Sequence, residues 1–264
     1  MSIAEDLDQL RSAGYVVQRN VLSADEVEAL RDTVERVARR ITDAAQRPGA
    51  GPEIELADGH RIQFSSKTAI QWEWLEGSQA IRIIEPIDQL DDHFAQLFEH
   101  PKLSAFAANA LDVERTGPFT SKLNLKRAKE GSRFPWHQDF PYWYVRIGEE
   151  AHDIVAAVIL LDDADAENGA LRVLPGSHKK GPFPRDPDDP LHSLADPAQV
   201  DDAQEVLLEA PAGSVVWFGS LLLHRSAPNL SDRDRRAVLH SFQPHGRAHY
   251  RDTPFEPQRV ERLP

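Results

Sequence analysis

The sequence contains no cysteine among its 264 residues. Disulfide bonds, thiolate metal sites and cysteine nucleophiles are therefore excluded. Long hydrophobic runs are also missing: the longest, residues 154–161, has the length of a strand and is too short to span a membrane. Residues 1–8 are acidic, whereas a secretory signal needs a basic start and an apolar run. We therefore expect a cytoplasmic protein without membrane association.

Acidic residues outnumber basic ones, with 43 Asp and Glu against 30 Lys and Arg. The formal net charge is −13, and a general nucleic-acid binder needs a basic face for the phosphates. We therefore expect no nucleic-acid partner. A local basic site for a small anion remains compatible with this charge. The length suits one large domain with a sizeable core, and no repeat or clear domain boundary interrupts it.

The first 118 residues read mostly as helix. Ser23 and Glu26 form a capping-box pattern, and apolar residues follow at helical spacing. A short strand is expected before this helix, at residues 14–21. Residues 54–64 predict a hairpin that turns at Asp58 and Gly59. A second helical stretch is expected over residues 88–111, interrupted near Pro101.

The pattern changes to strands after residue 118. Residues 181–197 are rich in proline and aspartate and predict a long loop. Many strands separated by turns are typical of a sandwich or barrel, here with helices packed outside. The expected strands are residues 119–126, 153–161, 171–178 (ending in a turn), 214–223 and 235–242.

Two residues stand out chemically, His137 and Asp139. Side chains two positions apart on an extended backbone point to the same side, so this imidazole and carboxylate can reach a common point. His224 would complete a set of two histidines and one carboxylate, which holds non-haem Fe(II) and leaves other coordination positions open. Taken alone, a hydrogen-bonded His–Asp pair and a buried core histidine explain the same residues. The surrounding sequence decides between these interpretations.

Four stretches of the surrounding sequence form a pattern together. They are Gly14-Tyr15 with Val21-Leu-Ser-Ala-Asp-Glu26, Lys122-Leu-Asn-Leu-Lys126 leading to Phe134-Pro-Trp-His-Gln-Asp139, Asn168-Gly-Ala-Leu-Arg-Val-Leu-Pro-Gly-Ser-His178, and His224-Arg-Ser-Ala-Pro-Asn229 followed by Arg235-Arg236. This pattern resembles the phytanoyl-CoA dioxygenase family of Fe(II)/2-oxoglutarate oxygenases, in particular its ectoine hydroxylase-like branch. After Trp143 the sequence differs from ectoine hydroxylase, so we expect a different substrate.

The resemblance implies a double-stranded β-helix (jelly roll, cupin-like) core, mainly β, with N-terminal helices packed outside. We expect a single oxygenase domain with a helical part over residues 1–118, the β-helix core over 119–245 and a C-terminal tail over 246–264. The resemblance also implies His137, Asp139 and His224 as ligands of Fe(II). Related halogenases have a small residue in place of the carboxylate, so Asp139 favours hydroxylation over chlorination.

The resemblance further implies the residues that bind 2-oxoglutarate, namely Arg235, Ser226 and Asn124. An arginine suits this role because its planar guanidinium binds a carboxylate through two hydrogen bonds and stays charged when buried. Arg235 and Arg236 cannot both point into the barrel, because adjacent strand residues face opposite sides. Family spacing selects Arg235, and we expect Arg236 to pair with an acidic neighbour.

The substrate pocket is harder to assign. Aromatic residues could form a wall around an apolar or cationic substrate, although such residues more often pack in the core. The candidates are Trp143, Tyr142, Phe140, Thr120 and Trp72, with Trp74 a weaker one.

The sequence therefore predicts a non-haem iron dioxygenase. It would use Fe(II), 2-oxoglutarate and O₂ to hydroxylate an unactivated C–H bond of a small molecule, with succinate and CO₂ as coproducts. One alternative is a catalytically silent jelly-roll protein that binds a small molecule in the same cavity. Another keeps the iron chemistry but ends in desaturation, cyclisation or epimerisation.

Overall fold

The computed structural model describes residues 2–47, 50–51, 53–56, 59–65, 68–73, 78–189, 194–256 and 258–259. Asp58, in the predicted hairpin turn, and Trp74 lie outside these residues, as does part of the predicted loop over 181–197. No helix in the described part of the chain is long and apolar enough to cross a membrane.

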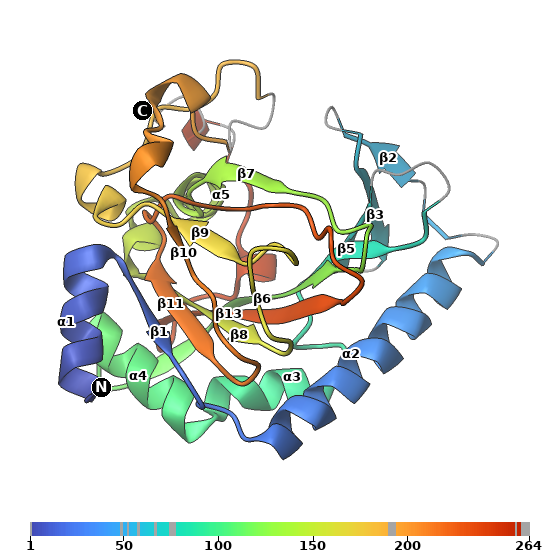
Figure 1. Cartoon of the computed structure of the whole chain (residues 1–264), viewed down its shortest axis with the longest axis horizontal. Helices are drawn as coiled ribbons and strands as arrows, with labels where there is room; N and C mark the ends of the chain where they lie inside the picture. The colour runs from blue at the N-terminus through green and yellow to red at the C-terminus, as the bar shows by residue number, and fades with distance from the viewer. Residues whose placement is uncertain are drawn as a thin grey trace.

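Two antiparallel sheets form the core of the protein (Figure 1). The large sheet has nine strands in the order β1-β11-β8-β13-β6-β5-β4-β3-β2, and the small sheet has four in the order β10-β9-β12-β7. The strands are β1 (Tyr15–Gln18), β2 (Glu53–Glu55), β3 (Arg61–Ser65), β4 (Thr68–Trp72), β5 (Ile81–Glu85), β6 (Thr116–Lys126), β7 (Phe134–His137), β8 (Val155–Leu160), β9 (Leu171–Val173), β10 (Val206–Leu207), β11 (Val215–Gly219), β12 (His224–Ser226) and β13 (Arg235–Pro244).

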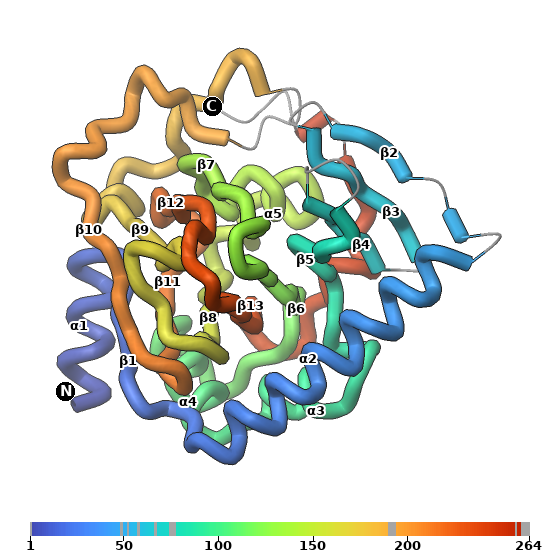
Figure 2. Tube along the Cα trace, turned by 45° about the vertical axis from the view of Figure 1, so that its right-hand side comes forward, coloured from blue at the N-terminus to red at the C-terminus, as the bar shows by residue number. Residues whose placement is uncertain are grey.

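The long helices cover the outer face of the large sheet. Figures 1 and 2 show α2, α3 and α4 along this face, with α1 near the edge formed by β1. The predicted capping box is present at the start of α2, where Ser23 accepts from the backbone of Glu26 and Glu26 reaches back. Pro101 begins α4, where a missing N–H costs nothing. The helices are α1 (Ile3–Ala13), α2 (Ala24–Ala45), α3 (Asp92–Gln96), α4 (Pro101–Leu111) and α5 (Phe140–Ile147).

Strand β8 shows why the central strands read as continuous apolar runs. All six of its residues are buried. Val155, Ala157 and Ile159 pack against the helices, in the outer core. The alternate residues Ala156, Val158 and Leu160 face the small sheet, in the inner core. A strand that is covered on both faces needs apolar residues at every position, because alternate side chains point to opposite faces.

The predicted mainly β core with helices outside is confirmed, as two facing sheets rather than a closed barrel. The predicted hairpin is also present, as the antiparallel pair β2 and β3. The expected strand over residues 14–21 is present as β1, which pairs with β11 at one end of the large sheet. The N-terminal third also holds β4 and β5, which its helical pattern did not indicate, and β5 joins β6. These short strands are set by pairing with distant segments, which local periodicity does not reveal.

Candidate metal and cosubstrate site

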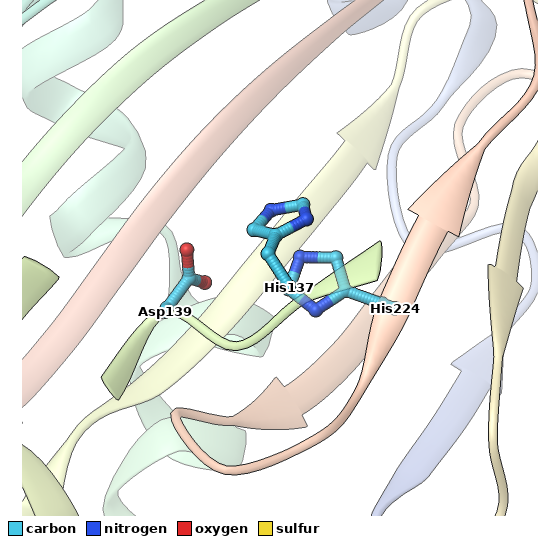
Figure 3. Close-up of side chains that lie close together, drawn as sticks. All are labelled: His137, Asp139 and His224. Atoms are coloured by element: carbon cyan, nitrogen blue, oxygen red, sulfur yellow. The ribbon is translucent and has the colours of Figure 1, made fainter. Parts of the chain in front are cut away.

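His137 and His224 lie side by side on paired strands of the small sheet. They are direct register partners between β7 and β12, and their ring centroids are 4.1 Å apart. Together with Asp139 they are the one group of potential metal ligands found in the described residues, with one ligand atom from each within 4.8 Å of the others. Figure 3 shows the two rings next to each other, with the carboxylate beyond the end of β7.

The backbone that carries Asp139 differs from the expectation. Strand β7 ends at His137, and Asp139 has helical dihedral angles (φ −72°, ψ −20°) at the start of α5. The expected extended backbone is therefore wrong for Asp139. The strand ends because the chain turns into a helix that has a proline in its first turn. The carboxylate reaches the histidines through this turn and not through strand alternation.

Hydrogen bonds to the backbone set the tautomer of both histidines. Nδ1 of His137 lies 2.8 Å from the carbonyl oxygen of Pro135, and Nδ1 of His224 lies 2.9 Å from that of Leu222. A carbonyl oxygen only accepts, so each Nδ1 carries the proton and donates it. Each Nε2 therefore keeps a free lone pair, the arrangement that a metal-binding imidazole needs. Burial, reinforced by the neighbouring His224, lowers the pKa of His137 to about 3, so the ring stays neutral.

The Asp139 carboxylate is also available. Asp139 occupies the N-cap position of α5, where aspartate usually accepts from the first turn of the helix. Its side chain makes no such capping bond, although the residue is only 7 % exposed. A buried carboxylate without this bond suits a cation as partner.

Gln138 anchors the turn between the two candidate ligands. Its side-chain amide donates to the carbonyl oxygens of Leu221, at 2.6 Å, and Gly181, at 3.1 Å. Its amide oxygen accepts from the backbone of Phe183 at 2.7 Å. The buried amide thus ties the ligand turn to the chain before His224 and to the 181–183 segment. No pattern in the sequence marks Gln138 as part of the site.

Arg235 places a positive charge between the two sheets. It lies on β13 two positions before Ala237, which belongs to the inner core, so both face the small sheet. Its side chain is buried, and its Nε has no hydrogen-bond partner among the described residues. Burial lowers its pKa to about 10. A buried guanidinium without an acidic partner in contact fits the carboxylate of a bound ligand.

The residues around Arg235 support the same kind of ligand. Lys126 is its register partner on β6 and donates to the carbonyl oxygen of Ala227, the neighbour of Ser226. Burial and the nearby Arg235 lower the pKa of Lys126 to about 6. Asn124 lies two positions before Lys126, and its buried side-chain oxygen has no hydrogen-bond partner in the described chain. This donor and acceptor set fits 2-oxoglutarate, as the ligand set fits Fe(II).

Arg236 points the other way, as strand alternation predicts. Its guanidinium is 2.8 Å from the Asp162 carboxylate and 3.0 Å from that of Glu35. The expected pairing of Arg236 with acidic neighbours is therefore confirmed. His240 has the opposite strand parity to Arg235 and lies on the outer face of the large sheet, where its ring stacks on that of Phe98 with centroids 4.0 Å apart.

The structure separates the candidate pocket residues into two groups. Trp143 and Phe140 are almost fully buried in a cluster around α5, and Trp72 is 1 % exposed in the outer core. Tyr142 instead lies with its ring centroid 6.5 Å from that of His137. Thr120 lies on the inner face of β6 and donates to Glu85 at 2.8 Å.

Glu85, Lys122 and Tyr250 also lie near the ligand set and were not singled out from the sequence. Lys122 shares the strand parity of Thr120 and Asn124, which could have identified it. Glu85 and Tyr250 come from β5 and from the C-terminal tail. Only the pairing of β5 with β6 and the path of the tail bring them to the site, so no local signal could have found them.

The chain matches one family model and several named proteins in sequence. The family model described as "Phytanoyl-CoA dioxygenase (PhyH)" matches residues 10–237. L-proline trans-4-hydroxylase of Streptomyces griseoviridis is 30 % identical over 247 residues, which cover 86 % of this chain and 80 % of that protein. Ectoine dioxygenase of Bordetella parapertussis is 27 % identical over 250 residues, covering 89 % of this chain and 73 % of that one.

Solved structures share the fold. EctD from S. alaskensis, with 2-oxoglutarate and 5-hydroxyectoine, superposes with a TM-score of 0.67 at 22 % identity, covering 92 % of this chain and 76 % of that one. The epimerase SnoN, in complex with Fe³⁺, alpha ketoglutarate and nogalamycin RO, has a TM-score of 0.67 at 19 % identity, covering 99 % and 88 %. The carbocyclase SnoK from nogalamycin biosynthesis has a TM-score of 0.67 at 21 %, covering 100 % and 91 %.

Proposed function

The chain belongs to the phytanoyl-CoA dioxygenase family, and from this premise we propose that it hydroxylates an unactivated C–H bond of a free small molecule. The enzyme is an Fe(II)- and 2-oxoglutarate-dependent dioxygenase, with succinate and CO₂ as coproducts. The observation that carries the proposal is the group of His137, Asp139 and His224, whose ligand atoms lie within 4.8 Å of one another. Two relatives are named for small molecules, L-proline and ectoine. A cytoplasmic location stays a prediction of the sequence.

Each residue of the site has a separate task in this proposal. Iron and 2-oxoglutarate supply the oxidising power for the reaction with O₂ when they are bound. The two imidazoles offer neutral Nε2 atoms, and Asp139 offers the negative charge. Arg235, with Ser226, holds the distal carboxylate of the cosubstrate, and Asn124 contacts it nearer the metal. The buried setting keeps water away from the reacting groups.

The site favours an active enzyme over a silent binding protein. A protein that only stored a small molecule would not need a buried guanidinium together with two histidines of the same tautomer. Desaturation, cyclisation and epimerisation share the ligand set, and the fold is shared with an epimerase and a carbocyclase. Hydroxylation is our proposal because the relatives of higher sequence identity are named as a hydroxylase and a dioxygenase.

Titration of the purified protein with Fe(II) and 2-oxoglutarate, without oxygen, tests the assignment. Bidentate binding of 2-oxoglutarate to Fe(II) gives a weak visible charge-transfer band that neither component gives alone. We expect this band, and we expect it to be lost in His137→Ala. His93→Ala removes an exposed histidine on α3 and serves as the matched control. Absence of the band in folded wild-type protein would refute the ligand assignment and favour the binding-protein alternative.

A further inference from the structure

A pair of opposite charges, Glu85 and Lys122, lies near the candidate ligands on the side of the large sheet that faces the small sheet, and neither residue is assigned to Fe(II) or 2-oxoglutarate. Glu85 ends β5, and Lys122 lies on the neighbouring strand β6. Lys122 alternates with Leu123, which packs in the outer core, so Lys122 faces the small sheet. Its Nζ lies 6.0 Å from the centre of the Tyr142 ring, which is itself 6.5 Å from the ring of His137.

Within the described residues, this ion pair is a loose one. Lys122 Nζ lies 3.6 Å from Glu85 Oε2, which exceeds the usual length of a charge-assisted hydrogen bond. The other oxygen of Glu85 accepts from Thr120 at 2.8 Å. Both side chains are about one-fifth exposed. Glu85 and Asp139 raise the pKa of Lys122, so the lysine is a cation at neutral pH.

Tyr250 of the C-terminal tail lies close enough to this pair to feel both of its charges. Tyr250 packs edge-on against Phe119, with ring centroids 5.6 Å apart. The Arg146 guanidinium lies 4.4 Å from the centre of the Tyr250 ring. Burial and the negative charge of Glu85 raise the pKa of Tyr250, so its hydroxyl stays protonated. Lys122 also interacts electrostatically with two of the candidate metal ligands, His137 and Asp139, so the pair lies near the ligand set.

We propose that Glu85 and Lys122 select a zwitterionic substrate, the substrate ammonium binding Glu85 and its carboxylate binding Lys122. The proposal rests on the dioxygenase function proposed above and names its substrate class as a free amino acid or a similar small zwitterion. Such a molecule replaces one loose ion pair by two charge-assisted hydrogen bonds. A substrate with a single charge leaves one partner unpaired in a half-buried site, which is costly.

The same charges disfavour the other substrate class expected for this family. A coenzyme A thioester carries several phosphates and no ammonium group, so it offers nothing to pair with Glu85. The Glu85 carboxylate also repels an anion with more than one charge. A zwitterion has no net charge, so it avoids this repulsion while still pairing with both residues.

A panel of matched compounds tests the proposal. The panel holds the twenty protein amino acids and ectoine, the N-acetyl and amide derivatives of the amino acids, and an acyl-CoA. Succinate formation is measured for each compound with the Fe(II)-loaded enzyme and 2-oxoglutarate. We expect the strongest stimulation from a zwitterion, and a loss of about tenfold to hundredfold when either of its charges is blocked. The proposal is overturned if the best compound carries a single charge or none, or if no zwitterion stimulates succinate formation.

Two variants test whether Glu85 and Lys122 cause the selectivity for zwitterions. Binding of the best compound is measured in addition to succinate formation. Lys122→Met and Glu85→Gln remove one charge each and keep the side-chain length. We expect each to raise the Kd of the best compound about tenfold to hundredfold, measured by calorimetry on the oxygen-free Fe(II)–2-oxoglutarate enzyme. The control variants Lys179→Met and Glu114→Gln change exposed residues and should bind as the wild type does.

The charge-transfer band separates failure of this proposal from failure of the proposed function. We expect Lys122→Met and Glu85→Gln to show the charge-transfer band at the same concentration of 2-oxoglutarate as the wild type. If Lys122→Met instead weakens 2-oxoglutarate binding and leaves the Kd of the compound unchanged, Lys122 serves the cosubstrate and the proposal is wrong. If the band is missing in the wild type, the dioxygenase function itself fails.

Discussion

Replacement of Arg235 by methionine is expected to have opposite effects on stability and on cosubstrate binding. In the free protein the guanidinium is buried, and its Nε has no partner among the described residues. Methionine fills most of the same space without a charge. The variant should therefore be more stable than the wild type without ligand, and should lose the stabilisation that 2-oxoglutarate provides.

The size of both effects can be worked out from the buried charge. Burial lowers the pKa of Arg235 to about 10, so the folded protein disfavours the charged form that it holds at neutral pH. At about 1.4 kcal/mol for each tenfold change in proton affinity, the cost is roughly 3 kcal/mol. For a chain of this size that corresponds to a rise in Tm of about 6–12 °C in Arg235→Met. Removing one partner of a buried charged pair costs about 2–5 kcal/mol, a loss of roughly 30-fold or more in 2-oxoglutarate affinity.

Thermal unfolding with and without saturating 2-oxoglutarate measures both effects in one experiment. Arg236→Met is the matched control, because Arg236 lies next in the chain but pairs with Asp162 and Glu35. This control should be less stable than the wild type, since Asp162 and Glu35 each lose one of their two arginine partners, and should keep the shift that 2-oxoglutarate causes. Loss of that shift in Arg236→Met but not in Arg235→Met would refute the assignment of the inward-facing arginine.

Three further predictions concern the rest of the site. Asp139→Ala should abolish hydroxylation because the site loses its anionic ligand, and unchanged product formation by mass spectrometry would remove Asp139 from the ligand set. Gln138→Ala breaks the three hydrogen bonds of the ligand turn and should lower Fe(II) affinity by about tenfold in a metal titration, whereas wild-type affinity would show that the turn holds without it. Lys126, with a pKa lowered to about 6, should take up a proton when anionic 2-oxoglutarate raises that pKa. The affinity for 2-oxoglutarate should then fall as pH rises above 6, and calorimetry in two buffers of different ionisation enthalpy should detect the proton uptake. A Kd for 2-oxoglutarate that does not change between pH 6 and 8 would contradict this.

The local patterns of the sequence predicted the elements whose causes are local. The capping box at Ser23 and Glu26 marks the start of α2, and the continuous apolar run over residues 154–161 marks the buried strand β8. Strand alternation also predicted that Arg235 and Arg236 face opposite sides. Each of these features depends on residues within a few positions of one another.

Asp139 and Gln138 show where local reasoning stops. The sequence indicated Asp139 as a ligand because an extended backbone would place its side chain on the same side as that of His137. In the structure the turn into α5 brings the Asp139 carboxylate to the histidines instead. Gln138 reads as an ordinary polar residue between two candidate ligands. Its role depends on carbonyl groups more than forty positions away, and no periodicity in the chain reports such a contact.

The sequence by itself determined the kinds of residue available to the site: two histidines, an aspartate, an arginine and no cysteine. The tertiary structure alone decided which of them meet. Pairing of β7 with β12 brings His137 beside His224, and pairing of β5 with β6 brings Glu85 beside Lys122. The physical reason is that strand register is set by burial of whole sheet faces and by partners far apart in the chain.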